Sequence, residues 1–241
     1  MGLAMAARVD ELMGLLARSG GFRPVERLDY TGSVSAEDLL VEARAVGEFR
    51  APSFVIDKGL QFAYENIAKW MVGDPSMLCM NPRTRTPERG DLKKGIYLAG
   101  RTGCGKTWAL EIFAYLARAH GFKYRLYGKD CGLVMQAFRT DAITGAYMQT
   151  GDLTPYIDAK VLVLNDLGTE PSEVLYMGNR VDVVRQVLEI RADNPARITF
   201  VTSNLPLHMD RELAERYGDR VASRLVQMCN YMEIKGEDKR R

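Results

Sequence analysis

The feature that most constrains this chain is a glycine-rich stretch, GRTGCGKT at residues 100–107. It follows an apolar segment at 96–99 that suits a β-strand, and it precedes residues with helical spacing. Glycine adopts backbone conformations that other residues avoid, so three glycines within this stretch predict a tight turn from the strand into the helix. The chain is therefore expected to contain a strand–turn–helix unit of an α/β fold.

The same stretch matches the pattern G-x-x-x-x-G-K-[ST] without a gap. In such a turn the backbone N–H groups surround phosphate groups, and the lysine reaches the β- and γ-phosphates. The hydroxyl of the last residue can ligate Mg²⁺. The residues expected to hold the phosphates are Gly100, Arg101, Thr102, Gly103, Cys104, Gly105, Lys106 and Thr107. The sequence therefore predicts nucleotide binding, and an ordinary glycine turn is the alternative.

Alternating apolar residues after position 95 predict further strands, separated by segments of helical length. The five candidate strands are residues 96–99, 123–127, 161–165, 198–204 and 231–234. Regular alternation of strands and helices predicts an α/β fold, with a mostly parallel sheet covered on both faces.

The N-terminal part is expected to be helical. Helical spacing runs through residues 4–18; a capping box at Ser35 and Asp38 predicts a second helix, and Asp57 a third that ends near Gly73. The polar residues 81–95 are typical of a loop or linker. The interpretation is a small helical region at 1–75, followed by a nucleotide-binding domain at 76–241.

Composition excludes several classes of protein. Of the 241 residues, 46% are hydrophobic and 27% charged, which is typical of a globular chain, and a net charge of +2 alone does not indicate nucleic acid binding. No apolar run approaches the roughly 20 residues of a membrane span, and residues 1–20 lack the pattern of a signal peptide. We therefore expect a cytoplasmic protein without membrane contact. The four scattered cysteines indicate neither a disulfide framework nor a zinc site.

Two later strands end in polar residues. In "KVLVLNDLGTEP", four apolar residues run into Asn165 and Asp166, where a metal-linked carboxylate and a base for water would be presented. The strand "ITFVTSN" ends at Asn204, whose amide could face the γ-phosphate or the attacking water. A buried strand that ends in a polar turn is the alternative at both places.

Arg220 and Arg224 are one helical turn apart, with Val221 and Leu225 predicted to face inward. Exposed arginines are most often only solvated. An arginine supplied by a neighbouring subunit, however, stabilises charge in phosphoryl transfer.

Together, "GRTGCGKT", "VLVLNDLGTEP", "FVTSNLP" and "YGDRVASRL" resemble the AAA+ ATPases of the DnaC helicase-loader and IstB transposition-helper group, over roughly residues 60–241. The resemblance implies an ATPase with a P-loop AAA+ domain, five strands and no C-terminal lid domain. It implies ATP and Mg²⁺ as cofactors, a Walker A loop at 100–107 and a Walker B pair at Asn165 and Asp166. It also makes Asn204 the sensor 1 residue and Arg224 the arginine finger, with Arg220 as a second candidate.

One position departs from the family pattern. Asn165 stands where an acidic residue is usual, so Mg²⁺ would rely on Thr107, the phosphates and Asp166, with Glu170 nearby. Binding should survive, and hydrolysis is expected to be slow.

Three functions fit the motifs. The first is a loader that places the replicative DNA helicase on single-stranded DNA and assembles as a ring or spiral through Arg224. The second is an IstB-like ATPase that assembles on DNA and assists a transposase; a small-molecule kinase is a third. Contacts with DNA are expected on residues 129–157, from Arg139, Thr140 and Tyr147, unless this segment only packs on the sheet.

Overall fold

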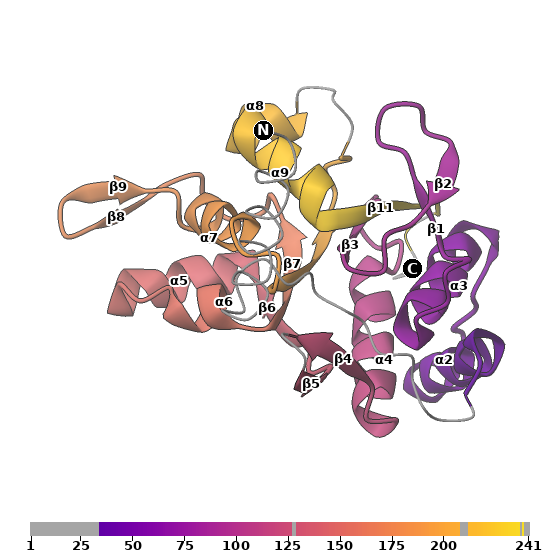
Figure 1. Ribbon diagram of the computed structural model, residues 1–241. Helices are drawn as coiled ribbons and strands as arrows, with labels where there is room; N and C mark the ends of the chain where they lie inside the picture. Colours follow the sequence, from indigo (N-terminus) through magenta and orange to yellow (C-terminus); the bar gives the residue numbers. More distant parts are fainter. Residues whose placement is uncertain (1–33, 127–128, 208–211, 237, 239–241) are drawn as a thin grey trace, which may run out of the picture.

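The computed structural model describes residues 34–126, 129–207, 212–236 and 238 (Figure 1). At its centre is a parallel sheet with strand order β11-β3-β10-β7-β6. The strands are β3 (Gly95–Gly100), β6 (Gln136–Arg139), β7 (Val161–Leu167), β10 (Ile198–Ser203) and β11 (Cys229–Ile234). The expected α/β fold with a five-stranded parallel sheet is confirmed. No helix follows β11 in the described part of the chain.

Helices cover both faces of this sheet, because alternate side chains of each strand point to opposite sides. Ile96 and Leu98 of β3 belong to one hydrophobic core, and Tyr97 and Ala99 belong to the other. The first core includes α2 (Ala36–Arg50), α3 (Lys58–Val72) and α4 (Lys106–Ala119). The second includes α5 (Thr140–Thr150), α6 (Thr154–Asp158), α7 (Val183–Ala192), α8 (Glu212–Tyr217) and α9 (Asp219–Met228).

The helix starts near the N-terminal end follow the predicted caps. Ser35 and Asp38 form the capping box of α2, and the Asp57 carboxylate accepts two backbone N–H groups at the start of α3. The helix expected at 4–18 lies outside the described residues. Since α3 packs against α4 and β11, it shares the first core with the sheet. The domain boundary near residue 75 stays a prediction.

The second strand of the sheet differs from the expectation. Residues 123–127 were expected in the sheet, but β4 (Lys123–Leu126) pairs antiparallel with β5 (Lys129–Gly132) in a separate hairpin. The edge position belongs to β6, which is mostly exposed. A short, exposed edge strand lacks the apolar alternation of a buried one, so the pattern selected the wrong segment.

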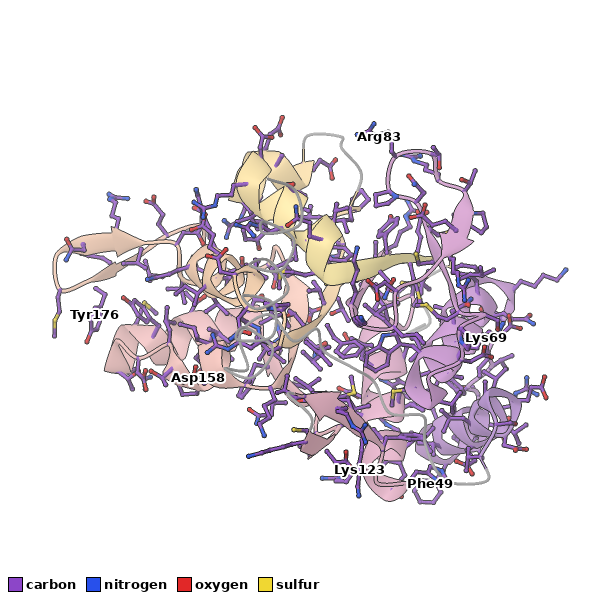
Figure 2. All side chains as sticks on the ribbon, in the orientation of Figure 1. Phe49, Lys69, Arg83, Lys123, Asp158 and Tyr176 are labelled. Carbon is purple, nitrogen blue, oxygen red and sulfur yellow. The ribbon has the colours of Figure 1, made fainter. Side chains whose placement is uncertain are left out.

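Two further hairpins complete the described fold. They are formed by β1 (Leu78–Met80) with β2 (Pro87–Arg89), and by β8 (Val174–Tyr176) with β9 (Asn179–Val181). The stretch 81–95, expected to be a loop or linker, therefore contains a strand. The second hairpin extends away from the sheet and carries Tyr176 near its tip (Figures 1 and 2). Among the described helices, none has the length and apolar character needed to cross a membrane.

Candidate functional site

The carboxyl ends of the parallel strands meet at one edge of the sheet, and the turn 101–105 joins β3 to α4 there. Gly103 and Gly105 have φ angles of 79° and 100°, a left-handed conformation that side chains disfavour. The turn leads into a helix of 14 residues that begins at Lys106. The helix dipole and the backbone N–H groups at the start of this helix make its N-terminus a site suited to an anion.

The Lys106 side chain lies inside this turn and is 5% exposed. Its Nζ donates to the carbonyl oxygens of Gly100 and Arg101 at 2.8 and 2.9 Å. It also donates to Oδ1 of Asn204 at 2.8 Å, while the Asn204 amide donates to the Thr102 hydroxyl at 3.2 Å. The structure thus brings Asn204, at the end of β10, into contact with the glycine-rich turn.

A cavity of about 780 Å³ opens beside the turn, and its size suits a nucleotide-sized ligand. Its lining divides into two kinds of surface. One comes from the connection between α2 and α3 and from the neighbouring helix surfaces: Ala51, Ser53, Phe54, Val55, Asp57, Leu60 and Trp108. The other comes from the turn and the strand ends: Thr102, Gly103, Gly105, Lys106, Thr107, Arg139, Asp166, Thr169 and Asn204.

Flat aromatic groups shape the first of these surfaces. The Phe54 ring stacks on Trp108 with centroids 5.9 Å apart, and the Arg50 guanidinium lies 4.6 Å from the Trp108 ring. Arg50 also pairs with Glu111 at 2.8 Å. Apolar and aromatic surfaces of this kind suit a planar base. Sequence reasoning missed this wall, because residues 51–57 form a connection with no recognisable motif.

The side chains of Asp166 and Asn165 have different surroundings. The Asp166 backbone adopts a left-handed conformation (φ 59°), and its carbonyl accepts the hydroxyls of Thr140 and Thr169 at 3.0 and 2.8 Å. Its carboxylate lines the cavity and accepts no hydrogen bond from any described residue. Asn165 is buried outside the cavity lining and accepts the Thr202 hydroxyl at 3.3 Å. The structure therefore brings Asp166, and not Asn165, to the cavity.

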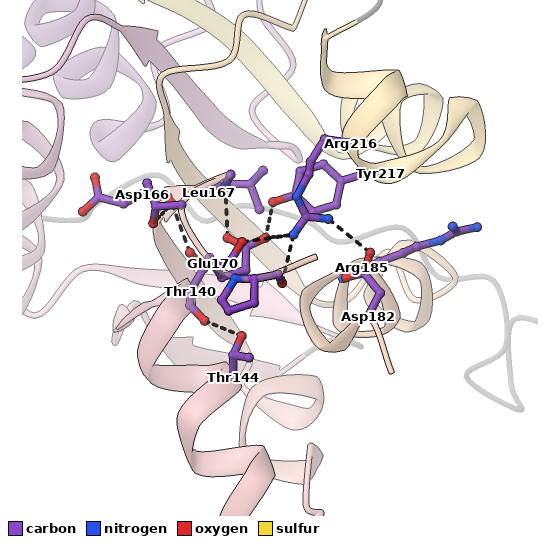
Figure 3. A network of polar contacts seen from close by, with 12 residues as sticks. Thr140, Thr144, Asp166, Leu167, Glu170, Asp182, Arg185, Arg216 and Tyr217 are labelled. Atoms are coloured by element: carbon purple, nitrogen blue, oxygen red, sulfur yellow. Dashed lines mark hydrogen bonds and ion pairs between the residues drawn. The ribbon is translucent and has the colours of Figure 1, made fainter. Parts of the chain in front are cut away.

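Glu170, the second carboxylate considered near the metal, belongs to a buried network (Figure 3). Its side chain is 1% exposed and pairs with Arg216 at 2.9 Å. Arg216 also contacts Asp182 at 3.3 Å, and the Tyr217 hydroxyl donates to Glu170. Burial raises the pKa of Asp182 and of Tyr217, although Arg216 opposes both shifts. Glu170 is thus turned away from the cavity, and no sequence motif indicated this pairing.

Arg220 and Arg224 lie on α9, outside the lining of the cavity in their own chain. Arg220 is exposed, and Arg224 pairs with Asp193 at 2.9 Å with 32% of its side chain exposed. Val221 and Leu225 are buried, as predicted from the spacing.

The residues expected to contact DNA are not equivalent. Thr140 is fully buried and donates to the Asp166 carbonyl, so it is not available for such a contact. Arg139 lines the cavity. Tyr147 is half-buried and packs against Tyr176, with ring centroids 5.1 Å apart.

The residues of the cavity fit a magnesium nucleotide. Its glycines keep the turn open, Lys106 carries a positive charge, and the α4 N-terminus faces the same space. Thr107 and Asp166 supply hard oxygen atoms, and Mg²⁺ commonly takes one or two protein ligands together with phosphates and waters.

This sheet order, with a phosphate-binding turn after β3 and polar residues ending β7 and β10, defines a P-loop nucleotide-binding domain of the AAA+ class. Residues 90–241 match the family described as IstB-like ATP binding protein. The chain belongs to this family. The matched stretch contains Lys106, Asp166 and Asn204, whereas the aromatic residue Phe54 lies before it.

Two solved structures are similar to the chain. One is a protein from Streptococcus pyogenes serotype M3 assigned provisionally as a primosome component, with 19% identity, a TM-score of 0.49, and coverage of 79% of this chain and 87% of that one. The other is the DnaC helicase loader, with 24% identity, a TM-score of 0.48, and coverage of 77% and 95%. No curated protein matches the sequence. Because these identities and TM-scores are low, the two structures carry no part of the family assignment. It rests on the sequence match and on the chain's own topology.

Proposed function

We propose that the chain is an ATP-hydrolysing AAA+ switch that loads the replicative DNA helicase onto single-stranded DNA. The observation that carries the ATPase part of the proposal is the convergence of Lys106, Asp166 and Asn204 on one cavity at the carboxyl edge of the sheet. The choice of a helicase as the partner is a prediction for the pulldown described below. Lys106 begins α4 after the glycine-rich turn, Asp166 lies near the end of β7, and Asn204 directly follows β10. Such convergence is typical of a site for phosphoryl transfer.

Each residue has a role that follows from its position. Lys106 exchanges its carbonyl and amide partners for phosphate oxygens, while Thr107 and Asp166 hold Mg²⁺, which neutralises phosphate charge and orients the reacting groups. Asn204, in contact with Lys106, positions the terminal phosphate or the attacking water. The aromatic wall at Phe54 and Trp108 holds the base.

Assembly follows from the position of Arg224. Its side chain is partly exposed, and its ion pair with Asp193 is partly solvated and therefore weak. We propose that Arg224 completes the cavity of a neighbouring copy, with Arg220 as the second candidate, so that active protein is a ring or spiral.

A second candidate is an ATPase that assembles on DNA and assists a transposase, and the family description favours it. The two functions predict different protein partners. Purified chain with ATP should retain the replicative helicase of its host in a pulldown and transfer it to single-stranded DNA. Retention of a transposase, with no helicase bound, would support the second function instead.

Nucleotide binding itself is tested with Lys106→Ala. Loss of a charge-assisted contact with the phosphates should weaken ATP binding by about 10- to 100-fold, measured by calorimetry. The exposed Lys93→Ala is the matched control and should leave the affinity unchanged. Equal ATP affinity in both variants would contradict the assignment of the cavity.

A further inference from the structure

We propose that Arg139 is a phosphate-binding residue of the nucleotide cavity, with Asp141 as its partner when no terminal phosphate is bound. The inference rests on the nucleotide function proposed above. It gives Arg139 a role different from the DNA contact expected from the sequence.

The strand order sets the direction of a bound nucleotide. The aromatic wall lies on the side of α3, which packs against β11, while the glycine-rich turn follows β3. Beyond β3 the edge continues through β10, β7 and β6 (Figure 1). With the base at the wall and the phosphates at the turn, the terminal phosphate points toward the ends of β7 and β6.

Arg139 is the last residue of β6 and lies opposite Asn165 in the register with β7. Its side chain lines the cavity together with Asp166. Lys106 and Arg139 are the two cationic side chains among the described lining residues. Lys106 lies within the glycine-rich turn. Arg139 is therefore the cation positioned to contact the phosphate farthest from the base.

The contacts of Arg139 resemble those that a phosphate would offer. Its Nε and Nη2 atoms donate to the two carboxylate oxygens of Asp141 at 3.1 and 2.9 Å. The guanidinium fork matches a carboxylate and a phosphate equally well in geometry. Hydrogen bonding to Asp141 and the nearby charge of Asp166 raise the pKa of Arg139, so it remains charged. Its side chain is 61% exposed, which leaves it room to turn.

Asp141 remains stabilised when Arg139 leaves it for a phosphate. This residue lies in the first turn of α5, where the helix dipole favours a negative charge. Its Oδ1 also accepts the backbone N–H of Ala142 at 2.8 Å. The loss of Arg139 therefore costs this carboxylate only part of its stabilisation. A terminal phosphate can then compete with Asp141 for the Arg139 guanidinium.

The test compares ATP with ADP, because only ATP carries the terminal phosphate. Arg139→Ala should weaken ATP binding by about tenfold and leave ADP binding nearly unchanged. Asp141→Asn removes the competing charge and should strengthen ATP binding severalfold, with no effect when Arg139 is already alanine. Arg180→Ala, an exposed ion-paired arginine outside the cavity lining, is the matched control and should change neither affinity.

The outcomes separate this inference from the function on which it rests. If wild-type protein binds neither nucleotide, the proposed function fails. If wild-type protein binds ATP and Lys106→Ala does not, while Arg139→Ala keeps full ATP affinity, only the inference fails. Equal losses of ATP and ADP affinity in Arg139→Ala would also overturn it, since a general structural role would then explain the effect.

Discussion

Asp166, near the end of β7, and Glu170, in the loop that follows, are two nearby carboxylates with different surroundings. Glu170 is buried, pairs with Arg216 and accepts the Tyr217 hydroxyl and the Gly168 N–H. Asp166 has its backbone fixed by hydrogen bonds, while its carboxylate faces the cavity. A buried charge is tolerated when it is fully paired, whereas a charge facing a cavity remains available to a ligand. We therefore expect Glu170 to contribute to stability and Asp166 to the chemistry of the site.

The same contrast holds for the two regions as wholes. The Glu170 network is satisfied within one chain. Arg216 and Tyr217 come from α8, Asp182 is the N-cap of α7, and Gly168 belongs to the same loop as Glu170. The cavity has an aromatic wall, a glycine-rich turn and cations, but Arg224 lies elsewhere in the same chain. We therefore expect the network to depend on folding alone and the cavity to depend on assembly as well.

The largest effect is expected from removing Arg224, the residue proposed to complete the cavity of a neighbouring copy. Arg224→Ala should keep ATP binding and lose turnover by about 10³-fold or more, because an arginine finger stabilises charge in the transition state. Turnover per chain of the wild type should also rise with protein concentration.

Mixing two inactive variants tests whether Arg224 acts on the neighbour. A Lys106→Ala chain still carries Arg224, and an Arg224→Ala chain still has an intact cavity. An interface between the two variants can therefore contain one complete site, so the mixture should recover part of the ATPase activity. A mixture as inactive as its components, with both variants folded and associating, would contradict action across the interface.

A matched pair of substitutions tests the comparison itself. Glu170→Gln should lower the free energy of unfolding by about 1–3 kcal/mol in urea titrations, because the largely buried Arg216 loses one of its two charge partners and keeps only Asp182. Asp166→Asn should change stability by less than about 0.5 kcal/mol, since asparagine tolerates a positive φ. Its turnover should nevertheless fall by about 100-fold or more.

Glu173→Gln is the control for these two variants. Glu173 forms an exposed pair with Arg180, so its loss should cost at most about 1 kcal/mol. If Asp166→Asn destabilised the protein as much as Glu170→Gln does, the division between chemistry and stability would be wrong.

The smallest effect is expected from Asn165→Asp, which restores the carboxylate that is usual in the family that the sequence resembles. Turnover at saturating Mg²⁺ should change little, because Asn165 is buried outside the cavity lining and Asp166 is the carboxylate at the proposed metal site. Steady-state ATPase assays decide the question. A severalfold rise in turnover would show instead that position 165 limits the metal site, as the sequence alone suggested.

Local signals in the sequence predicted much of this molecule. The caps at Ser35 and Asp57 and the strand before Gly100 depend on neighbouring residues, and the structure confirms them. The edge strand β6 escaped prediction because exposure removes its apolar alternation. Contacts between distant segments, such as Arg216 with Glu170, leave no periodic trace. The aromatic wall was missed for the same reason, since Phe54 and Trp108 meet only in the folded chain.

The Glu170 network has a further consequence for an assembly. Arg216 and Tyr217 are at the end of α8, and α9, which carries Arg224, begins at Asp219. The loop after β7, the strand that carries Asp166, is thereby tied through Glu170 and α8 to α9, the helix that carries Arg224. In a ring built through Arg224, each cavity would be coupled to the cavity of the neighbour that receives its arginine, and by linkage this coupling acts equally in both directions. In an open spiral, the Arg224 of one terminal copy would have no cavity to complete, and the cavity of the other terminal copy would receive no arginine, so the two ends would not be equivalent.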